Sequence, residues 1–312
     1  MSTLTQAVRS TTAGGEKPRR ASRLRTGTKR ALPAFYWMVW PAVIAFAAFH
    51  TLPVIVGIFF SFTNYAGYGA WNFVGLSNYV NLFQDDRILQ AYGFSFLFAI
   101  VATILTNIIS LAIALGLNAK IAGRSFFRGV YFVPYVLAIL VIGYVFQFLF
   151  SSSLPKILSG IPVFRDNILT SADWAWTAIV ALAVWQSCAF AIIIYLSGLQ
   201  TIPQELYEAA SIDGANAWRQ FRSITFPLIG AFFTINVVLS LKGFLQVFDQ
   251  IVALTNGGPG TSTESVTLLV FRGGFSGGEF AYQTANAVIF FIVITVVSLF
   301  QFRVLQRREA DF

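Results

Sequence analysis

Residues 208–227 read EAASIDGANAWRQFRSITFP, and this patterned polar segment lies between two long apolar stretches, at 174–199 and 228–252. A helix of about 20 apolar residues crosses the hydrocarbon core of a bilayer, so each flanking stretch is long enough to span it. The polar segment therefore leaves the lipid between two spans. Such ordered polarity in a membrane protein indicates a contact made outside the bilayer.

Composition places most of the remaining chain in lipid as well. Of the 312 residues, 56% are hydrophobic and 11% are charged, and the mean hydropathy is +0.70, which soluble domains of this length do not reach. Apolar windows of sufficient length occur six times, near 35–63, 91–118, 129–151, 174–199, 228–252 and 281–303. Lipid offers no partner to free backbone groups, so each window should be helical. We predict an all-α integral membrane protein with six transmembrane helices.

The basic residues are distributed unevenly about these spans. Sixteen of the 21 Lys and Arg residues fall on one side: eight lie within 1–30, and the others follow span two, follow span six or belong to the polar segment. The positive-inside rule places both termini and the segment at 200–227 in the cytoplasm. We expect residues 1–30 to form a disordered basic arm that touches membrane lipid, not nucleic acid. Residues 31–312 then form one membrane domain.

The chain has few residues that could carry out chemistry. Its one cysteine, Cys188, has no partner for an internal disulfide, and its one histidine, His50, has no acidic or cysteine neighbour at metal-ligand spacing. No nucleophile, base and orienting acid form a catalytic set, so we expect neither an enzyme nor a metal site. The sequence also lacks the G-x-x-x-x-G-K-S/T loop that cradles nucleotide phosphates, and we expect no cofactor in this chain.

Local stereochemistry predicts the shape of the polar segment. Thr201 is expected to cap a short helix that ends near Ile212. Gly214 can adopt the left-handed conformation that other residues resist, so the helix should break there, and Asp213 should cap the next helix. This second helix is predicted over 215–225. The result is a compact knob of two helices that can seat in a cleft of another protein.

The knob resembles the EAA loop of binding-protein-dependent ABC importer permeases, in which E-A-A-x-x-D-G-A precedes F-x-x-I-x-x-P. The matching residues are Glu208, Ala209, Ala210, Asp213, Gly214, Ala215, Phe221, Ile224 and Pro227, and Phe226 departs from the usual leucine. The resemblance implies the type I importer permease (MetI-like) fold. It also implies a partner, a dimer of cytoplasmic ABC ATPase subunits, which binds the ATP and receives the loop. The residues to which it assigns ATPase coupling are Glu208, Ala209, Ala210, Asp213, Gly214 and Ala215.

A second stretch narrows the resemblance. Residues 248–251 read FDQI and residues 254–259 read LTNGGP, which is similar to the MalF-type permeases of carbohydrate importers. This similarity implies that the chain forms half of a heterodimeric pore with a second, MalG-type permease subunit. It further implies an extracytoplasmic sugar-binding protein as a partner and a multi-pass location in a bacterial or archaeal plasma membrane.

Polar and aromatic residues in spans four and five are candidates for a sugar path. A sugar has apolar C–H faces and a polar rim, so an aromatic platform beside amides and hydroxyls suits it. Lys242, Gln246 and Asp249 follow i, i+4, i+7 spacing and are expected to share one helix face. The MalF-type resemblance adds further positions in the same two spans. The predicted path residues are Trp185, Gln186, Ser187, Phe190, Ser240, Lys242, Phe244, Gln246, Val247 and Asp249.

Two alternatives remain open for the charged stripe. Charges within spans are functional by default. The structural alternative is that Asp249 caps an outer loop and Lys242 pairs with a carbonyl or with an acid of a partner subunit. If the charges are functional, a rival function follows, namely an ion-coupled secondary transporter with Lys242 and Asp249 as a charge relay. The leading hypothesis is a permease subunit of an ATP-driven importer for a sugar or oligosaccharide, and the sequence does not name the sugar.

Overall fold

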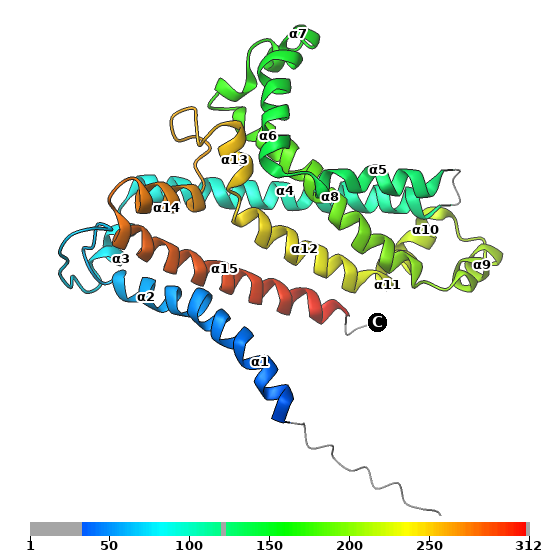
Figure 1. Ribbon diagram of the computed structural model, residues 1–312. Coiled ribbons are helices and arrows are strands. Elements are labelled where there is room, and N and C mark those ends of the chain that lie inside the picture. Colours follow the sequence, from blue (N-terminus) through cyan, green and yellow to red (C-terminus); the bar gives the residue numbers. More distant parts are fainter. Residues whose placement is uncertain (1–32, 120–122, 310–312) are drawn as a thin grey trace, which may run out of the picture. The chain divides into compact units, whose positions relative to one another are not determined.

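The computed structural model describes residues 33–119 and 123–309. The basic arm predicted at 1–30 and the C-terminal residues 310–312 lie outside the described residues. Figure 1 shows helices joined by loops, and the described residues contain no strand beyond an isolated bridge between Thr63 and Phe73. The all-α prediction is confirmed for this part of the chain.

Within residues 33–119 and 123–309, five helical runs are long and apolar enough to cross a membrane. They are Trp37–Phe60, Asp86–Asn118, Ile139–Ile157, Ala175–Gln200 and Phe280–Val304. A bent pair, Ala217–Leu228 with Gly230–Leu245, turns by 69° and brings the number to six if it is counted as one span. The chain is therefore a multi-pass membrane protein, and each predicted span has a helical counterpart.

The chain divides into two compact units, Met1–Leu52 and Pro53–Phe312. In the first unit, α1 (Pro33–Phe46) is followed by a π-helical turn, η1 (Ala47–Thr51). The side chains of this unit from Trp37 onward are all exposed in the isolated chain. An apolar helix with this exposure is suited to lipid or to another membrane subunit.

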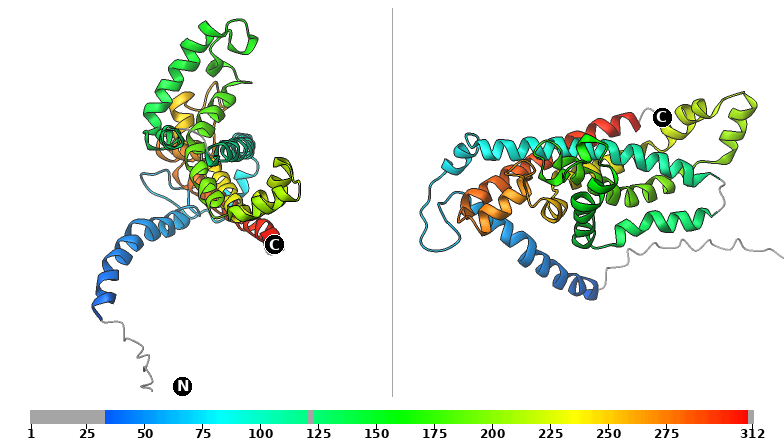
Figure 2. Two further views of the ribbon diagram at one scale, coloured as in Figure 1. Left: turned by 90° about the vertical axis from the view of Figure 1, so that its right-hand side faces the viewer. Right: turned by 90° about the horizontal axis from the view of Figure 1, so that it is seen from above.

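Three long helices form the core of the second unit. Helix α4 (Asp86–Asn118) packs against both α8 (Ala175–Gln200) and α12 (Gly230–Leu245) (Figure 1 and Figure 2). Small residues of α4 and α8, such as Ala99, Ala102 and Ala183, are fully buried. Small side chains let helix backbones approach closely, which is how helices associate where lipid supplies no hydrophobic drive.

Buried side-chain hydrogen bonds join the same helices. The Tyr195 hydroxyl on α8 donates to Asn107 Oδ1 on α4 at 2.6 Å, and Asn107 Nδ2 donates to the Thr103 carbonyl at 2.8 Å. Asn236 Nδ2 on α12 donates to the Ala191 carbonyl of α8 at 3.2 Å. Buried polar groups need such partners, so these bonds favour one register of the three helices.

The third span is not the continuous helix predicted over 129–151. Helix α5 (Arg124–Val136) ends before Leu137 and Ala138, which are extended, and α6 (Ile139–Phe148) then leaves in a new direction (Figure 1). Helix α5 packs on α8, whereas α6 packs on α13 (Asp249–Leu254). The chain is apolar on both sides of the break, although α6 is more apolar than α5, and hydropathy carries no signal of backbone direction.

The fifth span is also interrupted. Helix α12 ends at Leu245, and α13 begins at Asp249 after three non-helical residues. The prediction that Lys242, Gln246 and Asp249 share one helix face is therefore wrong. Their i, i+4, i+7 spacing describes a face only where the helix continues through all three positions.

Shorter elements complete the second unit. They are α2 (Leu52–Phe60), α3 (Ser77–Leu82), η2 (Leu149–Ser153), α7 (Leu154–Ile157), η3 (Pro162–Phe164), η4 (Ile168–Thr170), α9 (Gln204–Ile212), α10 (Ala217–Gln220), η5 (Phe221–Thr225), α11 (Phe226–Leu228) and α14 (Val266–Phe275). The last long helix, α15 (Phe280–Glu309), packs against α12 and α14.

Candidate functional site

The segment at 200–227 forms the predicted knob of two helical arms. Helix α9 is the first arm, and the continuous run α10, η5 and α11, over Ala217–Leu228, is the second. Between them Gly214 has a φ of +73°, as predicted. The Ala215 N–H donates to the Ala210 carbonyl at 2.9 Å and the Gly214 N–H to the Ser211 carbonyl at 3.1 Å. These two bonds are the Schellman pattern that closes a helix on a left-handed residue.

The predicted caps of the knob are wrong in detail. The Thr201 hydroxyl donates back to the Gly198 carbonyl at 2.7 Å, so it terminates α8 and does not start α9. Pro203 is the N-cap of α9 and holds the chain extended there. Asp213 ends the first arm, and Asn216 caps the second by accepting from the Arg219 N–H at 2.9 Å. Several Ser, Thr, Asp and Asn residues can cap, and the path of the backbone selects among them.

Side-chain bonds hold the two arms together. The Tyr207 hydroxyl lies 2.9 Å from Thr225 Oγ1, and Gln220 Nε2 donates to Ser211 Oγ at 3.1 Å and to the Ala215 carbonyl at 3.0 Å. These contacts cross from one arm to the other. The knob is therefore pre-organised, which lowers the entropy cost of docking to a partner.

The outer surface of the knob combines charge with exposed apolar groups. Of the residues predicted to couple, Glu208, Ala209, Asp213 and Gly214 are exposed and Ala210 and Ala215 are half-buried. Glu208 Oε1 accepts from Gln204 Nε2 at 2.9 Å, which orients its carboxylate along α9. Ile212 is 87% exposed and Trp218 is 68% exposed. Large apolar side chains presented on a polar loop are typical of a protein interface.

A second feature lies between the helices that the knob connects. A hollow of about 460 Å³ opens between α8 and α12, with Tyr135 of α5 at its wall. Six of the ten predicted path residues line it together: Gln186, Ser187, Phe190, Ser240, Phe244 and Val247. The structure thus brings together predicted residues from the fourth and the fifth span.

The hollow offers both an aromatic surface and polar groups. The Phe190 ring stacks on Tyr135, with centroids 5.4 Å apart and an interplanar angle of 19°. Gln250 Nε2 approaches Gln186 Oε1 at 3.5 Å, a distance so long that both amides are available to a ligand. Among the described residues, no lining side chain of this hollow is Lys, Arg, Asp, Glu or His. The site is therefore suited to an uncharged, hydroxyl-rich ligand.

Six of the twelve lining residues were not predicted as path residues, and three of these six are polar or aromatic. Asn236 and Gln250 are polar residues of the fifth span, and that polarity is a signal that sequence reasoning could have used. Tyr135 belongs to a different helix, α5, and only the packing of α5 on α8 brings it to Phe190. No sequence pattern connects these two positions.

The remaining four predicted path residues lie elsewhere. Trp185 contacts Phe146, with ring centroids 5.2 Å apart, and lines a separate, mainly apolar hollow with Leu105 and Cys188. Lys242, Gln246 and Asp249 are exposed in the isolated chain, and none of them lines the hollow between α8 and α12. In residues 33–119 and 123–309, no carboxylate lies within ion-pair distance of Lys242, and no group of three His, Cys, Asp or Glu side chains could hold a metal ion.

Comparison with known proteins gives concordant results. Residues 108–310 match the family model described as "Binding-protein-dependent transport system inner membrane component". The multiple sugar-binding transport system permease protein MsmF of Streptococcus mutans is 37% identical over 281 residues, covering 88% of this chain and 97% of the relative. The sn-glycerol-3-phosphate transport system permease protein UgpA of Agrobacterium fabrum is 30% identical over 278 residues, covering 88% and 94%.

The fold is similar to that of a solved transporter. The chain aligns with a subunit from the crystal structure of a bacterial ABC transporter involved in the import of the acidic polysaccharide alginate, with a TM-score of 0.76 and 25% identity. The alignment covers 88% of this chain and 95% of that one. Both the knob and the hollow between α8 and α12 fall within residues 108–310, which match the family model.

Proposed function

Since this chain belongs to the family of binding-protein-dependent transport system inner membrane components, we propose that it is the permease subunit of an ATP-driven ABC importer for a neutral sugar or oligosaccharide. Its family is one of transport components, so the chain is not itself an enzyme. One observation carries the proposal: the knob connects α8 directly to the helical run that leads into α12, and these two helices form the walls of the hollow. A force on the knob therefore acts on both walls of the candidate substrate path.

The lining of the hollow supports a sugar as the ligand. The stacked pair of Phe190 and Tyr135 offers an apolar face, and the amides of Gln186 and Asn236 and the hydroxyl of Ser240 offer hydrogen bonds. A volume of about 460 Å³ lies within the range of roughly 300–1,000 Å³ that small-molecule sites occupy. The lack of charge in the described lining favours a neutral sugar over a phosphate ester or a uronic acid, whose negative charge would be buried unpaired.

The partners follow from the same proposal. A dimer of cytoplasmic ATPase subunits binds the ATP and receives the knob, with Glu208 and Asp213 in polar contact and Ile212 and Trp218 in apolar contact. A second permease subunit completes the pore, and an extracytoplasmic binding protein delivers the sugar. All of them assemble at the plasma membrane of a bacterium or archaeon. Closure of the ATPases moves the knob and shifts the pore between inward-open and outward-open states.

The rival, an ion-coupled transporter with Lys242 and Asp249 as a relay, is not favoured. A relay needs its two charges within reach of each other or of a shared hydrogen-bonded chain. Here Lys242 belongs to α12, whereas Asp249 starts α13 beyond the interruption. Both side chains are exposed, and they lie outside the hollow.

Reconstitution tests the proposal. The chain, with its partner subunits and binding protein in proteoliposomes, is expected to take up a sugar only when ATP is present, whether or not an ion gradient is imposed. Uptake by the chain alone, driven by an ion gradient, would establish the rival instead. A panel of neutral sugars, uronic acids and sn-glycerol-3-phosphate identifies the substrate class.

A variant pair tests the hollow. Phe190→Leu keeps the bulk but removes the aromatic face, and it should raise the KM for uptake about fivefold, because a lost stacking contact is worth about 1 kcal/mol. The matched control is Trp185→Phe on the same helix, which lies outside the hollow and should leave KM unchanged. Equal kinetics for Phe190→Leu and the wild type would exclude this hollow from the substrate path.

A further inference from the structure

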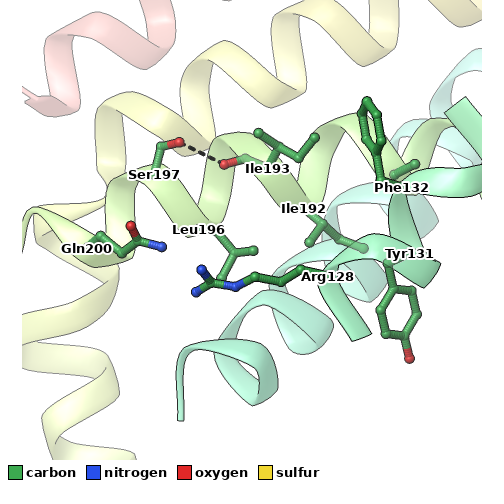
Figure 3. A pocket seen from close by; sticks show the side chains of 9 residues that line it. Arg128, Tyr131, Phe132, Ile192, Ile193, Leu196, Ser197 and Gln200 are labelled. Atoms are coloured by element: carbon green, nitrogen blue, oxygen red, sulfur yellow. Dashed lines mark hydrogen bonds between the residues drawn. The ribbon is translucent and has the colours of Figure 1, made fainter. Parts of the chain in front are cut away.

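Arg128 lines another hollow, between α5 and the last turns of α8, that the transport proposal does not use. The hollow measures about 210 Å³, and Figure 3 shows the Arg128 guanidinium extending toward the end of α8, beside Leu196 and near Gln200. Arg128 Nε and Nη2 are buried, and neither has a hydrogen-bond partner among the described residues. Buried donors of a permanently charged group that remain unpaired are costly, so the site is incomplete without an acceptor.

The hollow is polar at one end and apolar along the rest of its length. Arg128, Ser197 and Gln200 lie at one end, and Phe132 lies at the other (Figure 3). The Ser197 hydroxyl already donates to the Ile193 carbonyl at 2.9 Å, so Arg128 and Gln200 supply the free donors. The complementary ligand therefore has an anionic head and an apolar body.

The position of the hollow along the membrane normal identifies the kind of ligand. Arg128 lies one turn beyond Arg124, the first residue of α5, and Gln200 is the last residue of α8. The positive-inside rule places both of these helix ends on the cytoplasmic side. The guanidinium thus lies near the headgroups of the inner leaflet, and the apolar wall extends from it toward the hydrocarbon core.

We propose that this hollow binds an anionic phospholipid of the inner leaflet. Its phosphate accepts charge-assisted hydrogen bonds from Arg128 and a bond from the Gln200 amide, and an acyl chain packs along Leu196, Ile193 and Phe132. Basic pockets between transmembrane helices on the cytoplasmic side bind lipid phosphates in this manner. A carboxylate of a partner subunit could satisfy Arg128, but it would leave the apolar wall without a complement.

The Arg128 hollow lies at the end of α8, next to the knob, so a lipid bound there can stabilise the base of the knob. Gln200 precedes the segment that leads into α9, so a lipid seated here stabilises the end of α8 from which the knob departs. The Arg128 hollow is distinct from the sugar hollow, and lipid binding to it can be tested without a transported sugar. Its failure would therefore leave the transport proposal unaffected.

The test is lipid retention by the intact permease complex, measured by native mass spectrometry. During titration with dioleoylphosphatidylglycerol or dioleoylphosphatidylcholine, the wild type should retain the anionic lipid at least fivefold more strongly. Arg128→Gln should abolish most of this preference. Arg124→Gln, which removes the same charge from an exposed position one turn away, should change it less than twofold. Equal retention of the two lipids by the wild type overturns the proposal. So does an Arg128→Gln variant whose preference for the anionic lipid equals that of the wild type.

Two further measurements distinguish a bound lipid from a free anion and from a protein carboxylate. Soluble glycerophosphoglycerol and inorganic phosphate at millimolar concentration should not displace the lipid, because they lack the apolar body. Displacement by either would make this a free-anion site and refute the lipid. If Arg128→Gln instead loses the second permease subunit while phosphatidylglycerol retention persists, Arg128 pairs with a protein carboxylate and the lipid proposal is wrong. Equal retention of the two lipids by the wild type overturns the proposal even where the variant does not assemble.

Discussion

At the scale of single residues, Gly214 determines the shape of the knob. Its φ of +73° lies in the region that residues with a Cβ resist, and no atom lies within 4 Å of the place where a Cβ would project. A side chain at this position would therefore cause backbone strain but no clash. The left-handed conformation costs a non-glycine residue about 1–2 kcal/mol, which a folded knob can tolerate.

Proline at this position should have a much larger effect than alanine. Gly214→Pro requires a φ near −65° and removes the N–H that donates to Ser211, so the Schellman closure cannot form. We expect normal membrane insertion, no ATP-driven uptake and an ATPase rate no longer coupled to substrate. Gly214→Ala, as a control, should keep at least about a third of the uptake, because it only adds the strain of a left-handed alanine. Persistent uptake with a normal ATPase rate in Gly214→Pro would refute the coupling role.

At the scale of elements, every π-helical turn in the described part of the chain precedes a proline. Each of the π-helical turns η1, η2 and η5 ends two residues before a proline: Pro53, Pro155 and Pro227 respectively. In each, the residue before the proline donates its N–H five positions back, to Ala47, Leu149 or Phe221. A proline cannot donate to the carbonyl four positions back, and its ring crowds that carbonyl. Widening the preceding turn relieves the crowding.

Removing Pro227 should change how the knob is oriented relative to α12. Pro227→Ala permits a regular helix, and converting the π-turn to an α-turn rotates the residues before it by about 100°. We expect more ATP hydrolysed per sugar transported, measured in proteoliposomes. Pro155→Ala makes the same change at the start of α7, far from the knob (Figure 1), and should leave this ratio unchanged. An unaltered ratio in Pro227→Ala would mean that the π-turn does not orient the knob.

The interruptions within the third and fifth spans depend on each other. Helix α6 packs on α13, and Gly143 of α6 lies directly against Ala253 of α13, where a Cβ would overlap the alanine methyl group. The two segments follow the breaks at 137–138 and at 246–248. Because each segment covers the other, neither change of direction can be derived from its own span alone.

At the scale of the whole second unit, a polar network joins residues far apart in the chain. Arg87 Nη2 lies 2.9 Å from Glu279 Oε2, and Gln283 Nε2 donates to the same oxygen at 2.9 Å. The Tyr282 hydroxyl donates to Asp85 Oδ2 at 3.1 Å. These contacts tie the start of α4 to the start of α15. The ends opposite the knob are thereby held together.

Breaking this network should lower stability modestly. The Arg87 and Glu279 side chains are 40% and 37% exposed, so the pair contributes at most about 1 kcal/mol. We expect Arg87→Met to lower the free energy of unfolding by this amount at low salt, and much less in about 1 M salt, where charges are screened within roughly 3 Å. Arg165→Met, an exposed position in no ion pair of the described part of the chain, serves as the control. A loss independent of salt would assign the effect to packing.

The sequence by itself determined the properties that depend on composition and local stereochemistry. Side-chain transfer energies identify the apolar spans, the distribution of Lys and Arg orients them, and the resistance of L-residues to positive φ identifies the turn at Gly214. Half of the lining of the hollow was also predictable, because six residues of spans four and five match family positions and have suitable chemistry.

Only the tertiary structure decided where helices stop and which of them meet. It separated Lys242 from Asp249, brought Tyr135 onto Phe190, placed Trp185 outside the hollow and left the Arg128 guanidinium without a partner among the described residues. Hydropathy measures the transfer of side chains into lipid and is the same for a straight helix and a broken one. The breaks and contacts arise from packing between segments distant in sequence, and no local pattern encodes that packing.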